Sequence, residues 1–320
     1  MRRAVYLMLF GLSAAVATGV GYAGSWGGAL FDCEASGYSD DAFMGYCSNP
    51  AIGDYEHAAY WRGLEPRAVA ALRRAEIVTL GDSKSQYAFS SDTMLAYLRG
   101  TGRPFYILGF GYGEPGAFPP RLLEKVGAKP KLVIINADPF FLDDLSVAAE
   151  EAIHPTLRMR VGDWIKKWAQ PAHRWLCETL GACSFRYPDL FRSRSTGAWS
   201  WTSILANVHR VAFPPEVKPF SPELAEGIGV RAKAMLKPLG LPPGCVILTE
   251  VPDPARGFRA MVEAIHRATG APVVTVRPAG LLATDEEHMA KESAERWAAA
   301  FVAKVRPYVD ACLGGSEAGG

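Results

Sequence analysis

The sequence predicts a three-layer α/β fold built around a five-stranded parallel sheet, with a helical insertion at about residues 145–240. Short apolar runs that read as strands alternate with amphipathic helical patterns, and the runs are apolar throughout, as in strands buried on both faces. That alternation is typical of a parallel sheet with helices on both sides. The expected strands are residues 77–80, 105–108, 132–135, 246–249 and 273–276.

Length and composition are those of one large globular unit. The chain has 320 residues, of which 49% are hydrophobic and 21% charged, and its net charge is +1. A near-neutral chain gives no argument for nucleic acid or for electrostatic association with a membrane. We expect no nucleic-acid partner, and the sequence shows no metal-binding pattern and implies no cofactor.

The N-terminus resembles an export signal. Met1, Arg2 and Arg3 are followed by an apolar run at residues 4–20 and by small residues up to Gly24. A basic start, an apolar stretch and small residues define a signal peptide, and the run is also long enough for an uncleaved anchor. A buried helix is the alternative. Residues 1–24 therefore predict a periplasmic or extracytoplasmic protein, tethered to the inner membrane if the segment is retained.

Six cysteines fit an oxidising compartment. Cys33 and Cys47 bracket a short polar loop, and Cys177 and Cys183 bracket five residues, so each pair is expected to form a local disulfide. Zinc binding is the rival, but neither pair has a histidine partner at zinc-ligand spacing. Cys245 and Cys312 are either buried thiols or a third pair.

Three further segments follow from the pattern. Residues 25–70 precede the first strand and form a cystine-stapled entry segment, residues 71–312 form the main domain, and residues 313–320 form a disordered tail. Within the insertion, Trp164, Trp168 and Trp175 fall on one helical face. We expect this stripe in the core; the alternatives are a platform for sugar rings or a helix at a membrane interface.

The first predicted strand ends at a candidate nucleophile. Gly81, Asp82 and Ser83 follow the run at 77–80 and precede a helical pattern, which describes a strand-turn-helix unit. Such a turn exposes a serine hydroxyl at the carboxyl end of a strand, near N–H groups that can stabilise an oxyanion. The alternative role of Ser83 is to cap the helix.

A serine nucleophile needs a base, and the sequence supplies one near its end. Asp285 and His288 lie three residues apart, ahead of an amphipathic helix. In this arrangement His288 takes the serine proton and Asp285 orients the imidazole. Gly111 and Asn136 also follow predicted strands, and the carboxyl ends of parallel strands meet at one edge of the sheet. We expect Ser83, Gly111 and Asn136 to supply the oxyanion hole.

These blocks resemble those of the GDSL/SGNH hydrolase family. The resemblance rests on Gly-Asp-Ser at residues 81–83 and Asp-x-x-His at residues 285–288, and covers roughly residues 75–140 and 240–310. It implies a flavodoxin-like, SGNH hydrolase-like fold and a Ser-His-Asp triad. The family's third block reads Gly-x-Asn-Asp; here Ala137 takes the place of its asparagine, and Asn136 comes one position earlier. Membrane-tethered members with altered third blocks resemble proteins that O-acetylate exopolysaccharides.

The function expected from these features is that of an exported serine esterase or O-acyltransferase. Its substrate is an acyl ester, with acetyl as the expected group, of a cell-surface or secreted polysaccharide, and a membrane-bound acyl donor or synthase complex is an expected partner. Trp199 and Trp201 are candidate substrate-binding residues because aromatic faces suit sugar rings. The alternatives are a non-catalytic glycan-binding or scaffold subunit of a polysaccharide export complex and a lipid-directed esterase.

Overall fold

The computed structural model describes residues 32–49, 52–111, 114–137, 140–141, 144–181, 183, 187, 189–200, 210–214, 217–284 and 287–314. The helices are α2 (Glu56–Trp61), α3 (Pro66–Arg74), α4 (Ser83–Phe89), α5 (Asp92–Gly100), α6 (Phe118–Val126), α7 (Val147–Ile153), α8 (Leu157–Leu180), α9 (Pro222–Leu236), α10 (Arg259–Thr269) and α11 (Lys291–Gly314). The strands are β1 (Ala42–Cys47), β2 (Gly53–Asp54), β3 (Ile77–Gly81), β4 (Phe105–Gly109), β5 (Leu132–Asn136), β6 (Asp189–Ser193), β7 (Val211–Ala212), β8 (Lys218–Pro219), β9 (Val246–Thr249), β10 (Arg256–Gly257) and β11 (Leu282–Ala283).

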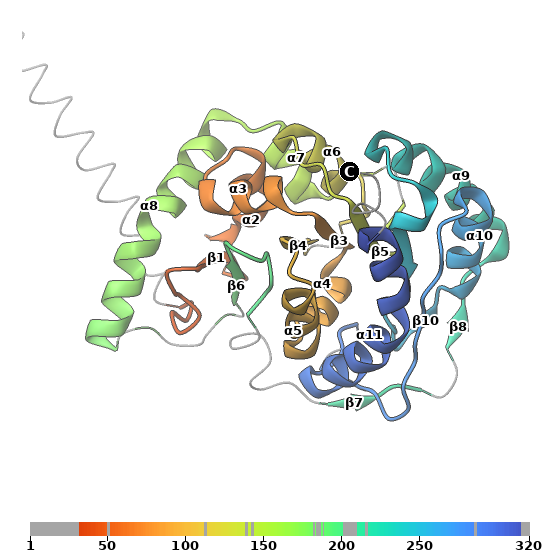
Figure 1. The fold of residues 1–320 in the computed structure, drawn as a ribbon. Coiled ribbons are helices and arrows are strands. Elements are labelled where there is room, and N and C mark those ends of the chain that lie inside the picture. The colour runs from red at the N-terminus through yellow and green to blue at the C-terminus, as the bar shows by residue number, and fades with distance from the viewer. Residues whose placement is uncertain are drawn as a thin grey trace, which may run out of the picture.

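A four-stranded parallel sheet forms the centre of the molecule, in the order β4-β3-β5-β9 (Figure 1). Four of the five predicted strands are therefore confirmed, and the fifth is wrong as a strand. The stretch at residues 273–276 makes one parallel bridge to the sheet, between Val273 and Leu248. Its ladder is limited to two hydrogen bonds, from the Leu248 N–H to Pro272 and from the Val274 N–H to Leu248, while Val274 and Val276 are buried. The apolar run therefore indicates burial more than strand pairing.

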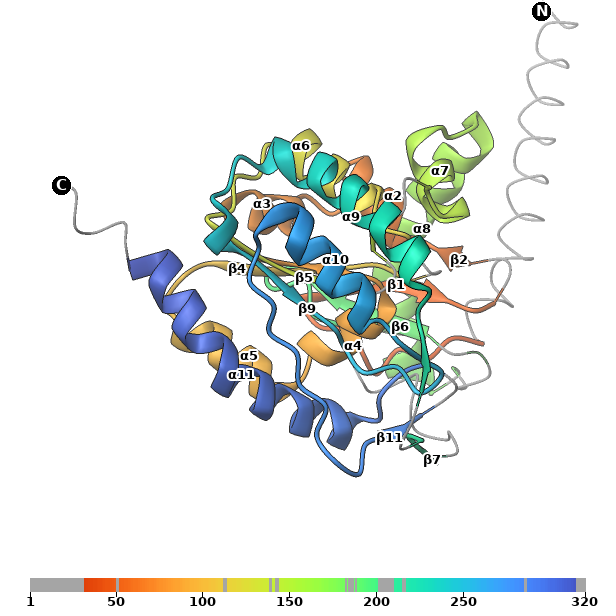
Figure 2. The ribbon, with the colours of Figure 1, turned by 90° about the vertical axis from the view of Figure 1, so that its right-hand side faces the viewer.

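Helices cover both faces of this sheet, which confirms the three-layer α/β prediction (Figure 2). Successive strand residues point to opposite faces. Val78 and Leu80 pack into a cluster with α3, α6, α9 and α10, whereas Ile77 packs into a second cluster with α4, α5 and α11. The largely apolar character of these strands follows from this double coverage.

The entry segment and the insertion meet in a second sheet that the sequence did not reveal. Strand β1 of the entry segment pairs antiparallel with β2 and with β6, which comes from the insertion (Figure 1). The insertion predicted as helical therefore also contains strands. Two smaller sheets join β8 to β10 and β7 to β11.

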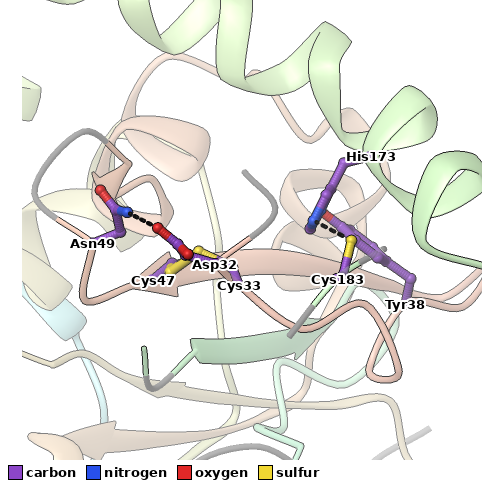
Figure 3. Close-up of a disulfide and its surroundings, with 7 residues drawn as sticks. All are labelled: Asp32, Cys33, Tyr38, Cys47, Asn49, His173 and Cys183. Atoms are coloured by element: carbon purple, nitrogen blue, oxygen red, sulfur yellow. Dashed lines mark hydrogen bonds between the residues drawn. A yellow bond between two sulfur atoms is a disulfide. The ribbon is translucent and has the colours of Figure 1, made fainter. Parts of the chain in front are cut away.

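Three disulfides are present. Cys33 bonds to Cys47 and Cys177 to Cys183, the pairs expected from their spacing. Cys245, at the start of β9, bonds to Cys312 near the end of α11, which decides between the two alternatives for these cysteines. Figure 3 shows the Cys33–Cys47 bond beside Asp32, below the helix that carries His173. Three disulfides indicate an oxidising, extracytoplasmic location.

The tryptophan stripe of the insertion does not lie in the core, contrary to expectation. Trp164, Trp168 and Trp175 on α8 are 58%, 60% and 60% exposed. The physical reason is that α8 is attached to the protein through its opposite, polar face. In the part of the chain that the structure describes, no helix combines the length and the apolar character needed to cross a membrane.

Of the boundaries predicted at the two ends of the chain, the structure describes only the C-terminal one. The expected signal or anchor at residues 1–24 lies outside the described residues. At the other end, α11 continues to Gly314, two residues beyond the expected limit of the domain. Leu313 on this helix is buried in the hydrophobic core. Residues 315–320 of the expected tail also lie outside the described part.

Candidate active site

The turn between β3 and α4 is shaped by a glycine and a capping aspartate. A Cβ atom on Gly81 would lie 2.2 Å from Ser85 Oγ, so glycine allows α4 to approach the strand end closely. Asp82 caps the helix, because its Oδ1 accepts a hydrogen bond from the Ser85 N–H at 3.2 Å. Ser83 is consequently the first helical residue rather than the cap. Its neighbours Asp82 and Lys84 are buried, whereas Ser83 is partly exposed.

The hydroxyl of Ser83 meets the imidazole of His288. Ser83 Oγ lies 2.8 Å from His288 Nε2, although 205 positions separate the two residues in the sequence. The backbone of His288 is bonded to the end of β11, because the Thr284 N–H donates to the His288 carbonyl oxygen at 2.8 Å. The ring of Tyr87 lies 4.5 Å from the imidazole, between centroids, and limits its movement. The 2.8 Å between Ser83 Oγ and His288 Nε2 is the distance expected of a nucleophile and its general base.

Asp285, the predicted third member of the triad, lies outside the described residues. The structure therefore describes a serine–histidine pair at this site. Trp201, a predicted substrate-binding residue, also lies outside the described residues.

A cavity of about 260 Å³ opens above the pair. It lies at the carboxyl ends of β3 and β4, and the small β2-β1-β6 sheet and the turn at His288 form its walls. A larger cavity of about 510 Å³ lies between α6 and α9, but none of the described residues that line it is a serine, histidine or cysteine. The contact between Ser83 and His288, rather than cavity size, identifies the candidate site. The cavity is lined by Tyr46, Asp54, Glu56, Ser83, Tyr87, Gly111, Leu190, Trp199, Glu287 and His288.

Gly111, a predicted oxyanion donor, is brought to the site but bonds to a protein carboxylate. Its N–H donates to Glu56 Oε1 at 3.2 Å. Glu56 also accepts from Arg192 Nη1 at 2.8 Å and from Trp199 Nε1 at 3.3 Å. Glu56 and Arg192 are both essentially inaccessible to solvent. Burial raises the pKa of Glu56, and the guanidinium of Arg192 acts against that shift.

Asn136, the third predicted oxyanion residue, lies at the end of β5 and is not among the residues that line the cavity. Its side chain is fully buried, and its Oδ1 accepts a hydrogen bond from the Val251 N–H at 2.9 Å. This contact ties the end of β5 to the loop after β9. Asn136 also lies next to the Gly81 turn, because a Cβ on Gly81 would be 3.0 Å from Asn136 Cβ.

Trp199 lines the cavity as predicted by its candidate role, yet only 7% of it is exposed. Its ring packs edge-on against Tyr87, with centroids 5.6 Å apart. Trp199 therefore shapes the wall and leaves little of its surface for a substrate. Tyr46 on β1 is more exposed and lines the same cavity.

A buried histidine lies behind the cavity. His57 Nδ1 is 3.0 Å from Asp54 Oδ2, and its Nε2 is 3.7 Å from Glu114 Oε2. Burial alone lowers the pKa of His57, but the carboxylates of Asp54, Glu114 and Glu56 raise it to about 10. His57 is thus a cation at neutral pH, and it neutralises Asp54 at the cavity wall.

Two clusters among the described residues bring metal-ligand atoms within 4.8 Å of one another. The cysteines of the first, Cys177 and Cys183 beside His173, are bonded to each other. In the second, Asp54, Glu56 and His57, the histidine binds Asp54 and the glutamate binds Arg192. Both sets of ligand atoms are engaged within the protein, and we assign no metal to either.

Most residues that form the walls could not be chosen from the sequence. Tyr46, Asp54 and Glu56 belong to the entry segment, and Leu190 belongs to β6. No motif marks them, and they reach the site because β1 pairs with β6. The one available signal was the polar pair Glu56 and His57 at the start of an otherwise apolar helix.

Comparison of the chain with models of protein families, with curated proteins and with solved structures finds no match.

Proposed function

We propose that the protein is an exported serine esterase or O-acyltransferase of the SGNH type, acting on short acyl esters of a polysaccharide. The observation that carries this proposal is the 2.8 Å contact between Ser83 Oγ and His288 Nε2 at the mouth of a cavity. The resemblance of residues 81–83 and 285–288 to the GDSL/SGNH family supports it. So does the strand order: counted along the chain the sheet reads 2-1-3-4, and the bridge at Val273 adds a fifth position beside β9, as in flavodoxin-like folds.

The proposed chemistry has two steps. Ser83 Oγ attacks the ester carbonyl while His288 Nε2 takes its proton, and the alkoxide of the substrate then leaves with that proton. A water or a sugar hydroxyl next attacks the acyl-serine, and His288 again moves the proton. Asp285 is the proposed orienting carboxylate.

The N–H groups of Ser83 and Gly111 are the proposed oxyanion donors. Because the Gly111 N–H donates to Glu56, it would have to exchange this carboxylate for the oxyanion or share its hydrogen between them. We assign Asn136 an indirect role, holding the loop after β9, because its amide oxygen accepts from Val251.

Cavity size and charge favour a short acyl group on a neutral sugar. About 260 Å³ accommodates an acetylated sugar unit better than a fatty acyl chain, so a lipid-directed esterase is disfavoured. Among the described residues, no lysine or arginine lines the cavity, while three carboxylates do. A polyanionic chain would find no lysine or arginine side chain among the described residues of the cavity lining.

The same bond between Gly111 and Glu56 favours a second candidate, a glycan-binding subunit without catalysis. A buried carboxylate already occupies one predicted oxyanion donor, and fold alone does not require chemistry. The two candidates differ in whether Ser83 becomes acylated.

The test is to incubate the full chain, purified in detergent, with 4-nitrophenyl acetate and to follow its intact mass. We expect an acetyl adduct on the native protein and on Ser85→Ala, a control at a buried hydroxyl that donates to the Asp82 carbonyl oxygen. The adduct should be absent from Ser83→Ala. His288→Gln should slow its formation, whereas His154→Gln, at an exposed histidine, should not.

An adduct that persists until a polysaccharide is added identifies a transferase, and one that clears in water identifies an esterase. If neither an adduct nor nitrophenol appears with acetyl or longer acyl donors, the catalytic proposal is wrong and the glycan-binding candidate takes its place.

A further inference from the structure

Helix α8 presents its apolar side to solvent. Leu157, Val161, Trp164, Trp168 and Trp175 are 78%, 48%, 58%, 60% and 60% exposed. They follow one another at intervals of four, three, four and seven residues, so they form one narrow line along the helix, here called the aromatic stripe. Figure 1 shows α8 as a long helix at the edge of the molecule.

The opposite side of α8 is polar and attaches the helix to the protein. Asp163 pairs with Arg62 at 2.6 Å, and Gln170 bonds both the N–H and the carbonyl oxygen of Met44 at 3.1 Å. His173 lies 3.1 Å from the Tyr38 hydroxyl (Figure 3). A helix on an ordinary protein surface has the reverse arrangement, since burial of its apolar side supplies most of its stability. The aromatic stripe therefore needs an apolar surrounding that the described part of the chain does not provide.

We propose that α8 lies on the surface of an anionic phospholipid bilayer, with the aromatic stripe among the headgroups. Tryptophan suits this depth, because its ring is apolar while its N–H can still reach water or lipid oxygens. Basic residues lie beside the stripe: Arg158 on one side, Arg160 and Lys167 on the other. Over its length α8 has five basic and two acidic residues, a net charge of +3, against +1 for the whole chain. A basic amphipathic helix of this kind binds in the membrane interface.

The position of Asp32, where the described chain starts, agrees with this orientation. The described chain starts at Asp32, whose carbonyl oxygen accepts from the Tyr187 N–H at 3.1 Å, and continues to Tyr38 beneath His173 of α8. The apolar run predicted as a membrane anchor ends at residue 20. The twelve steps from there to Asp32 span at most about 40 Å. A chain anchored by that run would keep α8 within reach of the same bilayer.

A second copy of the chain fits the stripe less well. The exposed area of the aromatic stripe is on the order of 600 Å², judged from the size of tryptophan side chains. A stable interface takes about 800 Å² from each partner. Two stripes packed together would also bring the basic residues on their flanks close to one another.

The test is tryptophan quenching by brominated lipid, which does not depend on the chemistry at Ser83. The full chain is placed in phosphatidylglycerol-containing vesicles with and without brominated acyl chains, beside a Trp164→Ser, Trp168→Ser, Trp175→Ser variant. The chain has eight tryptophans. If they emit equally, the three in the stripe supply three eighths of the emission, and most of that share should be lost to bromine. A matched control is Leu224→Ser with Val230→Ser, at residues 62% and 72% exposed on α9, which should quench like the native protein.

Replacing Arg158, Arg160 and Lys167 with Gln should lower the quenching of the stripe in anionic vesicles and leave it unchanged in phosphatidylcholine. The proposal is overturned if the emission that distinguishes the native protein from the triple variant is unaffected by brominated lipid. It is also overturned if light scattering shows a dimer in detergent that the triple variant converts to a monomer, since a second copy would then cover the stripe.

Discussion

The buried pair of Glu56 and Arg192 allows a sharp prediction about stability. Arg192 Nη1 lies 2.8 Å from Glu56 Oε2, Nη2 donates to the Ile107 carbonyl oxygen at 2.9 Å, and neither side chain of the pair is accessible. The guanidinium also lies 4.8 Å from the ring centroids of Tyr60 and Phe110. Arg192→Met fills much of the space but leaves the Glu56 carboxylate buried without its cation.

Removing one partner of a buried ion pair costs about 3–5 kcal/mol, because the remaining charge is left uncompensated. That is a large part of the roughly 5–15 kcal/mol by which proteins are stable, and we expect the melting temperature to fall by roughly 10 °C. The loss should be accompanied by weaker acylation of Ser83, since Glu56 also holds Gly111 and Trp199 at the cavity.

Urea unfolding followed by circular dichroism measures the cost, with Arg174→Met as control. Arg174 also pairs with a glutamate at 2.8 Å, but on the exposed side of α8, and its loss should not change the unfolding free energy measurably. The double variant Glu56→Gln, Arg192→Met should cost less than the sum of the single variants, because no buried charge remains. Strictly additive costs, or a cost of Arg192→Met below about 1 kcal/mol, would refute the reasoning.

Three further predictions follow from other contacts. The pKa of His57 is raised from 6.5 to about 10, so its contribution to stability is complete below pH 6.5 and is lost as the pH rises through 10. The unfolding free energy of the native protein should fall faster over this range than that of His57→Gln, and equal slopes would show that His57 is neutral. Cys245 and Cys312 are 67 residues apart, so replacing both with serine should cost about 4 kcal/mol in urea unfolding, and an unchanged midpoint would contradict this. Gly81→Ala should reduce nitrophenol release by roughly 100-fold by displacing α4, whereas Gly162→Ala, where a Cβ meets open space, should not; equal rates would show that the turn tolerates a side chain.

The residues of the candidate site that could be predicted are those marked by a motif in the neighbouring sequence. The turn at Ser83 needs a glycine, a capping aspartate and a buried strand, and all three are adjacent in the sequence. His288 was predicted from its order after the nucleophile, and the structure brings it to Ser83. Glu56, by contrast, carries no motif, and its importance arises from Arg192, 136 positions away.

The sequence by itself determined the α/β alternation, four parallel strands, the strand-turn-helix unit at Ser83 and the two short-range disulfides, because periodicity, glycine geometry and spacing are local properties of the chain. Tertiary structure alone decided that residues 273–276 make one bridge instead of a strand, that Cys245 reaches Cys312, and that β1 pairs with β6 to wall the cavity. It also decided that the tryptophans of α8 face outward. Helical periodicity places side chains on one face but does not say which face meets the protein; the polar contacts of Asp163, Gln170 and His173 do.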